Sequence, residues 1–311
     1  MILVAGSANL DFVVRASHIP APGETVLGHD FQTFPGGKGA NQAVACARSG
    51  AATTHLLLAL GSDAFATPIE ASLRDAGVHL HTVRASGLPT GTAFICVSDQ
   101  AENAITVAPG ANNALRAGDL PALAGFSHLL LQLETPLDTV AAYAKMARAQ
   151  GVTVVLNAAP ARALPADLLA VVDVLVVNEG ELTTLSPLPG TLAQKLERLG
   201  VPCGVVTLGA RGCCAHQGGR WWLQPGFAVN ALDTTAAGDT FCGTLTAALS
   251  RHESLAGALR QASAAGALAC LRLGAQSSMP TQAEVDAFLQ TQPEASEHAL
   301  ATLQQYCGLA P

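Results

Sequence analysis

Residues 152–181 read VTVVLNAAPARALPADLLAVVDVLVVNEGE, and the expected fold rests on this stretch. Two short runs in it, residues 152–157 and 174–178, are apolar almost throughout. Strands of that composition are buried on both faces, as in a parallel sheet that helices cover on both sides. The stretch therefore predicts an α/β fold with a parallel sheet.

The same alternation extends in both directions from this stretch. Further apolar runs occupy residues 2–6, 55–60, 128–133 and 204–208, and segments of helical period lie between the runs at residues 40–48, 64–76, 137–150 and 192–199. Residues 212–226 are typical of a hairpin with a Gly-Gly turn, and the chain from residue 238 to about residue 290 is helical in character. The pattern predicts a doubly wound, mostly parallel sheet flanked by helices.

Two regions break this rhythm, because residues 26–34 and 92–107 alternate apolar and polar side chains. Such alternation is typical of antiparallel strands with one open face. We expect a small antiparallel β sheet that stands off the main body, with strands from about residues 12–34 and 92–108, and that covers a site or pairs with a copy of itself. The chain 1–311 is interpreted as a single domain, with residues 291–311 as a C-terminal extension that forms a terminal helix or a loose tail.

The composition excludes several classes of protein. The 311 residues include 16 Lys and Arg against 23 Asp and Glu, a net charge of −7, which does not favour binding to nucleic acid or to a membrane surface. The N-terminus lacks a basic segment typical of a signal peptide, and no apolar run is long enough to span a membrane. We expect a soluble, cytoplasmic protein whose eight cysteines, none in a C-x-x-C pair, are buried reduced thiols.

One glycine motif, DTTAAGDTFCG at residues 233–243, joins a strand-like run to a helical run. It places residues 236–239 at a helix N-terminus, where free N–H groups and the helix dipole bind anions. Asp239 lies in that first turn, and a simple N-cap is the alternative interpretation. An N-cap alone does not account for the small residues before Asp239, whereas space for a ligand does.

A second glycine motif, PGGKGANQ at residues 35–42, imitates a phosphate-binding loop in composition. It lacks the G-x-x-x-x-G-K-[ST] spacing, because Gly39 follows Lys38 and Gln32 stands five positions before Gly37. Its glycines permit positive φ and close approach of the backbone to a ligand. The amides of Asn41 and Gln42 suit hydroxyls better than phosphates, and a tight packing turn is the alternative.

Three shorter motifs carry weaker signals. NEGE at residues 178–181 follows an apolar strand, where ligands of α/β sheets bind, and suits either a hydrated Mg²⁺ or a helix cap. TLGARG at residues 207–212 follows the next strand and suits a nucleotide or an ordinary turn. In SANLD, Asn9 and Asp11 share one face of a strand, and Glu134 ends another strand.

Together these motifs resemble the ribokinase family of sugar kinases over about residues 3–290. The resemblance also includes ENAITVAPGAN at residues 102–112 and GAQSSMP at residues 274–280. It implies ATP-dependent phosphoryl transfer to the primary hydroxyl of a sugar, namely O5 of D-ribose, which gives D-ribose 5-phosphate. The same chemistry on fructose, a 2-keto-3-deoxy sugar acid or a nucleoside is the alternative, and a sugar-binding regulator of kinase ancestry is a third.

The resemblance also implies roles for individual residues. Sugar-binding residues would be Asn9, Asp11, Gly37, Lys38, Asn41 and Glu134, together with the catalytic base Asp239; Ala236, Ala237 and Gly238 would form the anion hole. The ATP site would comprise Asn178, Thr207, Gly209, Ala210, Gly212, Gly238 and Ser263, with Glu181 organising Mg²⁺; Ser263 stands where a larger residue is common. The loop for a monovalent cation, K⁺, would comprise Asp233, Thr235, Ala269, Arg272, Gly274 and Ser278, and the small sheet would be a lid that also forms a homodimer.

Overall fold

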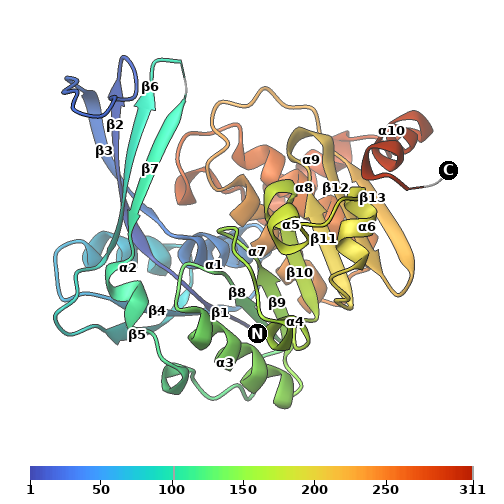
Figure 1. Ribbon diagram of the computed structural model, residues 1–311, viewed down its shortest axis with the longest axis horizontal. Coiled ribbons are helices and arrows are strands. Elements are labelled where there is room, and N and C mark those ends of the chain that lie inside the picture. The colour runs from blue at the N-terminus through green and yellow to red at the C-terminus, as the bar shows by residue number, and fades with distance from the viewer. Residues whose placement is uncertain (101, 310–311) are drawn as a thin grey trace.

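The computed structural model describes residues 1–100 and 102–309, and its main feature is a nine-stranded sheet (Figure 1). The strands follow the order β13 (Arg220–Pro225), β12 (Gly212–Gln217), β11 (Cys203–Thr207), β10 (Val174–Asn178), β9 (Thr153–Asn157), β8 (His128–Leu131), β1 (Ile2–Ala5), β4 (Thr54–Leu60) and β5 (His79–Arg84). The seven strands from β11 to β5 in this order run parallel, whereas β12 pairs antiparallel with β11, and β13 pairs antiparallel with β12. The predicted doubly wound, mostly parallel sheet is confirmed.

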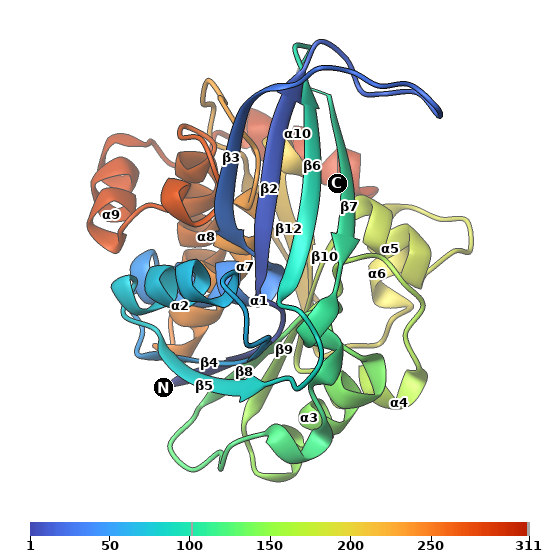
Figure 2. The same cartoon turned by 90° about the vertical axis from the view of Figure 1, so that its left-hand side faces the viewer.

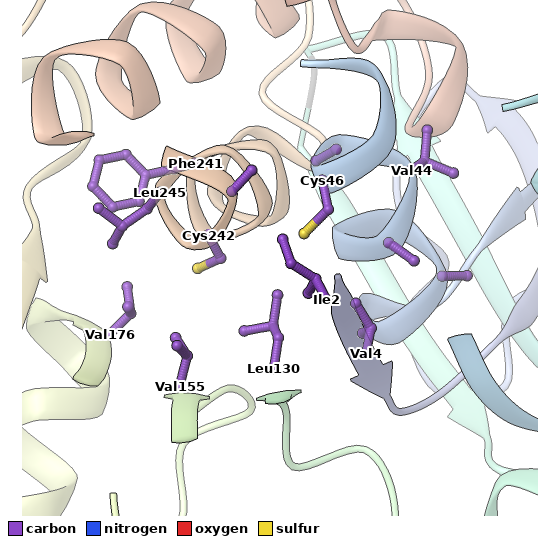
Figure 3. Close-up of a cluster of buried hydrophobic side chains, with 14 of the residues drawn as sticks. Ile2, Val4, Val44, Cys46, Leu130, Val155, Val176, Phe241, Cys242 and Leu245 are labelled. Carbon is purple, nitrogen blue, oxygen red and sulfur yellow. The ribbon is translucent and has the colours of Figure 1, made fainter. Parts of the chain in front are cut away.

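Helices cover both faces of this sheet, as the apolar strands require. One face packs on α1 (Lys38–Arg48), α2 (Ala66–Asp75), α7 (Ala237–Ser250) and α8 (Leu255–Ala269). The other face packs on α3 (Leu137–Ala149), α4 (Ala166–Leu169), α5 (Glu179–Leu185), α6 (Leu192–Glu197) and α10 (Glu297–Cys307). Figure 3 shows part of the first core, where Ile2 and Leu130 of the sheet lie beneath Cys46 and Cys242 of two helices.

Edge strand β5 was not predicted from the sequence. It reads HLHTVR, a run in which histidines, Thr82 and Arg84 interrupt the apolar residues. A strand at the edge of a sheet needs less apolar surface than a central strand, because one of its sides meets solvent. Periodicity alone therefore gives a weak signal for it.

The small sheet stands off the main body and comprises β3 (His29–Gly36), β2 (Asn9–Ala16), β6 (Gly91–Ser98) and β7 (Asn103–Ala108) in that order (Figure 2). Its outer pairs are antiparallel as predicted, but the central pair β2–β6 is parallel. The cause is connectivity: β2 follows β1 and β6 follows β5, so both leave parallel strands of the main sheet in the same direction. The first lid strand begins at Asn9, which places Asn9 and Asp11 at the base of the lid.

The C-terminal extension forms helix α10 after α9 (Gln282–Thr291), so it is a terminal helix rather than a loose tail. Ser296 caps α10, and Leu303 and Cys307 are buried against the sheet. All eight cysteines are free, and six of them are buried. In the part of the chain that the structure describes, every helix is too short or too polar to cross a membrane.

Candidate active site

Asp239 lies in the first turn of α7, one of the longest helices of the fold. The N-cap is Ala236, in the left-handed region at φ 57°, so the alternative of Asp239 as a simple N-cap is wrong. Only 8 % of Asp239 is exposed, and its carboxylate accepts hydrogen bonds from Asn41 Nδ2 at 3.0 Å and Gln42 Nε2 at 2.9 Å. A Cβ on Gly238 would meet no atom within 4 Å, so open space lies beside this turn. The helix N-terminus therefore presents a fixed carboxylate beside room for a ligand.

The two glycine motifs meet because α1 and α7 pack at short range. A Cβ on Gly243 would lie 2.5 Å from both Gln42 O and Ala45 Cβ, so only glycine permits this approach. Residues about 200 positions apart thereby place the amides of α1 on the carboxylate of α7. This arrangement explains the glycine at position 243 of the motif at residues 233–243.

The loop before α1 follows lid strand β3 and turns tightly against the segment after β1. Gly37 has φ 90°, and a Cβ there would lie 2.8 Å from Ala8 Cα and from Asn9 N. The backbone N–H of Lys38 donates to Glu134 Oε2 at 3.0 Å, and Ser7 Oγ donates to the same oxygen at 2.6 Å. The loop is thus both a packing turn and a support for Glu134.

Several charged side chains gather beneath the lid, where Glu134 and Asp239 act on both Asp11 and Lys38. Burial, with added repulsion from Glu134 and Asp239, raises the pKa of Asp11 to about 7. The nearby Asp239 carboxylate raises the pKa of Lys38, and Glu134 adds to this effect. The cluster holds one fixed cation and several acceptors in a partly desolvated space, which suits a ligand that carries several hydroxyls.

Asn9 is held by a residue that the sequence interpretation did not select. Asn112 Nδ2 donates to Asn9 Oδ1 at 2.7 Å, while Asn112 Oδ1 accepts from the N–H of Ala8 at 3.0 Å. A Cβ on Gly91 would lie 2.3 Å from both side chains. The sequence signals for Asn112 are its place after lid strand β7 and at the end of the motif at residues 102–112.

A chain of buried amides behind Asp239 was also missed. Gln132 Nε2 donates to Gln42 Oε1 at 2.7 Å, and Gln42 Nε2 donates to Asn157 Oδ1 at 3.0 Å as well as to Asp239. On the far side, Gln276 Nε2 donates to Asn41 Oδ1 at 3.3 Å. A glutamine inside the apolar run LLLQL was the available signal, since a buried polar group needs a partner.

The residues predicted for the nucleotide follow the carboxyl ends of adjacent strands β10 and β11. Asn178 and Glu181 form a reciprocal cap at the start of α5, with both hydrogen bonds at 2.8 Å. Burial raises the pKa of Glu181, while Lys38 lowers it and Asp239 raises it by charge interaction. These interactions place the Glu181 carboxylate near the cluster beneath the lid. Thr207 ends β11. The 3₁₀ turn Gly209–Arg211, which contains Ala210, comes next, and Gly212 begins β12. Ser263 lies half-buried on α8, with its hydroxyl 3.6 Å from Cys213 Sγ.

The two segments predicted for a monovalent cation lie side by side. Asp233 Oδ1 accepts from the N–H of Thr235, and Asp233 Oδ2 from the N–H of Gly274, both at 2.9 Å. Arg272 pairs with Glu284, and Ser278 Oγ donates to Ala275 O at 2.8 Å. The side chains of Arg272 and Ser278 are thus engaged elsewhere, in the loop that follows Ala269 at the end of α8.

The family model of the pfkB family carbohydrate kinases matches residues 1–282, and the chain belongs to this family. The predicted family resemblance is confirmed. Ribokinase from Haemophilus influenzae is 39 % identical over 304 residues, which cover 93 % of this chain and 98 % of that protein. The structure of ribokinase from Thermotoga maritima has a TM-score of 0.87 at 36 % identity, covering 93 % of this chain and 99 % of that one. Arabidopsis thaliana ribokinase complexed with ribose and ATP has a TM-score of 0.85 at 32 % identity, covering 94 % and 99 %.

Proposed function

We propose that this carbohydrate kinase transfers the γ-phosphoryl group of ATP to O5 of D-ribose and releases D-ribose 5-phosphate and ADP. The observation that carries the proposal is the position of Asp239. It lies at the N-terminus of α7, held by two amides of α1, beside the hydroxyl-binding cluster. The relatives named ribokinase, and the neighbour complexed with ribose and ATP, support this substrate pair.

The sugar binds beneath the lid. Its hydroxyls are held by Asn9, Asp11, Lys38, Asn41 and Glu134, and the backbone of Gly37 approaches it closely. The charged groups of the cluster favour sugar binding, because hydrogen bonds to charged groups are stronger than hydrogen bonds between neutral groups. Asn112 positions Asn9 for the same purpose.

Asp239 acts as the general base. As O5 forms its bond to the γ-phosphorus, the bond from that phosphorus to the β–γ bridging oxygen breaks, and the O5 proton moves to the Asp239 carboxylate. The N–H groups of Ala236, Ala237 and Gly238 stabilise the negative charge on the transferred group, which is the main task in phosphoryl transfer. These three residues lie at the positive end of the α7 dipole.

ATP lies along the carboxyl ends of β10 and β11, against Asn178, Thr207, Gly209, Ala210, Gly212, Gly238 and Ser263. Glu181 fits an indirect role toward Mg²⁺, because it is a buried carboxylate whose Oε2 already accepts a hydrogen bond from the N–H of Asn178. Bound Mg²⁺ supplies positive charge to the phosphates. An Mg²⁺ ion in such a kinase site is held chiefly by phosphates and water.

K⁺ binds in the loop formed by Asp233, Thr235, Ala269, Arg272, Gly274 and Ser278. Carbonyl and carboxylate oxygens are ligands that hard cations prefer. The N–H groups of Leu232 and Asp233 both donate to Cys270 O, which fixes the two halves of the loop together. The ion would hold the start of α7 in place without contacting the sugar.

The lid forms a homodimer contact through its apolar face. Phe12 stacks on Phe94 with ring centroids 5.4 Å apart and on Phe31 at 6.1 Å, yet Phe31 and Phe94 remain 62 % and 54 % exposed. A second copy of the same face would cover these rings.

The substrate is tested by a panel assay with purified protein, ATP, Mg²⁺ and K⁺. We expect kcat/KM for ribose to exceed that for fructose, a 2-keto-3-deoxy sugar acid and nucleosides by at least roughly 10²-fold, since a site built for particular hydroxyls rejects analogues strongly. A faster rate with one of those substrates would refute ribose. An absence of phosphoryl transfer to every sugar would refute the kinase and favour a sugar-binding regulator.

A further inference from the structure

Helix α10 lies beyond the residues that the family model matches, yet it is firmly seated on the fold. Leu303 and Cys307 belong to the buried core on its face of the sheet. A hydrogen bond between the Cys307 and Cys214 thiols, together with burial, raises the pKa of Cys214. These contacts fix the orientation of the last turn of α10.

That last turn directs one aromatic side chain at two loops. Tyr306 Oη donates to Glu179 Oε1 at 2.6 Å, and the guanidinium carbon of Arg211 lies 4.2 Å from the centroid of the Tyr306 ring. Glu179 is the first residue of α5, next to Asn178, and Arg211 ends the turn between Gly209 and Gly212. One side chain therefore contacts the segments that follow both β10 and β11.

The start of α5 is fixed by the Asn178–Glu181 cap, whereas the turn after β11 is held mainly by backbone hydrogen bonds, including one from the N–H of Gly226 to Arg211 O at 3.0 Å. The turn after β11 is held by the N–H of Arg211 on Leu208 O at 3.2 Å and by the N–H of Leu208 on Gly212 O at 2.8 Å. Thr207 Oγ1 donates to Val177 O at the long distance of 3.4 Å. A loop that is not held in place must be ordered when a ligand binds, and this ordering weakens affinity.

We propose that Tyr306 is a positioning residue for the nucleotide site. It joins the α5 and 209–211 segments from outside and holds them in the conformation that ATP requires, without contacting ATP itself. The inference rests on the proposed function, which assigns these two segments to ATP. It gives a role in that site to a helix beyond residue 282.

The test compares three variants with the parent by calorimetry, using a non-hydrolysable ATP analogue with Mg²⁺ and, separately, ribose. We expect Tyr306→Ala to raise Kd for the analogue about three- to tenfold, because it removes both a cation–π contact and a hydrogen bond to a charged group. Tyr306→Phe keeps the ring and should raise Kd about two- to threefold. Gln305→Ala, an exposed neighbour on α10, is the matched control and should leave Kd unchanged.

Ribose binding and hydrogen exchange separate positioning from a general loss of stability. We expect Kd for ribose to stay within about twofold in all variants, while amide exchange in residues 207–212 accelerates in Tyr306→Ala. A double-mutant cycle of Tyr306→Phe with Glu179→Gln should be non-additive in Kd for the analogue. A Tyr306→Ala protein that melts earlier but binds the analogue as the parent does would overturn the inference alone. A parent that binds no nucleotide would overturn the proposed function as well.

Discussion

At the residue scale, Asp239 and Asp11 differ in their surroundings, and the difference suits them to different tasks in the site. Asp239 receives two amide hydrogen bonds at a helix N-terminus, which is an environment that holds a carboxylate in one orientation. Asp11 lies against Gly36, where a Cβ would come 2.1 Å from Asp11 Oδ2, and beside two other carboxylates. The first residue suits proton transfer at a fixed point, and the second suits a ligand that brings hydroxyl donors.

Replacing the proposed base should affect the chemical step selectively. Asp239→Asn should lower kcat by roughly 10²–10⁴, the usual contribution of a general base. The amide is nearly isosteric with the carboxylate, so Kd for ribose should stay within about threefold. Steady-state kinetics and calorimetry check these two values, and a variant with near-normal kcat would remove the base assignment.

The raised pKa of Asp11 predicts a pH-dependent effect on stability. The folded protein holds the Asp11 proton up to about pH 7, whereas the unfolded chain releases it near the ordinary value of 3.8, so this group lowers stability as pH rises between the two. Asp11→Asn removes the penalty and should increase the free energy of unfolding of the ligand-free protein at pH 8 by about 1–2 kcal/mol.

At pH 4 the difference between the Asp11→Asn variant and the parent should nearly vanish, because the parent carboxyl is then largely protonated. Urea unfolding at both pH values measures this, with Asp286→Asn on the exposed side of α9 as the control. An equal effect at pH 4 and pH 8 would contradict the prediction. KM for ribose should rise in the same variant, since a hydroxyl acceptor is lost.

At the element scale, the site depends on how closely α1 approaches α7. Glycines at this contact let the two helices approach closely, and buried amides from α1, β9 and the residue after β8 then complete the contacts behind Asp239. Each member of that chain is held by another element. Small shifts between the helices should therefore reach the catalytic carboxylate directly.

Gly243→Ala tests this packing. The new Cβ would lie 2.5 Å from Gln42 O and would push α1 from α7, at a cost of about 1–3 kcal/mol in the free energy of unfolding. We expect kcat to fall as well, because Gln42 holds Asp239. Gly118→Ala, where a Cβ meets no atom within 4 Å, is the control. Unaltered stability in Gly243→Ala would show that the helices relax at no cost.

The cation loop gives a second prediction at this scale. Activity at fixed ionic strength should be several-fold higher in K⁺ than in Na⁺ or Tris buffers, because the ion would fix the start of α7. Asp233→Ala removes the carboxylate that accepts the N–H groups of Thr235 and Gly274, and should abolish the difference. Equal initial rates of the parent in all three buffers would exclude the ion.

At the scale of the whole molecule, the lid stands off the main sheet (Figures 1 and 2), and it carries exposed apolar side chains, among them Phe94, Ile105 and Val107. The face that carries Asp11 also carries Val107, which pairs with Ala93, the neighbour of Asp11, and is exposed. Closure over a bound sugar would bury that face and exclude water from the transfer. The opposite face carries the phenylalanine stack.

If that opposite face forms the homodimer, its rings control association. Phe31→Ser with Phe94→Ser should raise the dimer dissociation constant at least roughly tenfold, because more than one large apolar side chain leaves the contact. Sedimentation velocity over a concentration series measures the shift. Leu188→Ser, equally exposed but away from the lid, should leave association unchanged. A parent that remains monomeric at high concentration would rule out the contact.

The parts of this protein that depend on neighbouring residues could be predicted from the sequence. Apolar runs such as residues 174–178 specify buried parallel strands, and the small residues before Asp239 specify an open helix N-terminus. Period, capping preference and backbone freedom act over a few positions, so one chain is enough to show them.

The tertiary structure decided which distant residues meet. Gln42 donates to Asp239 and is itself bonded to Gln132 and Asn157 only because separate segments of the chain converge, and Tyr306 reaches Arg211 only because α10 folds back on the sheet. The parallel central pair of the lid likewise follows from the path of the chain. A side chain carries no local mark of its partner, because pairing of polar groups is set by packing across the molecule rather than by spacing along it.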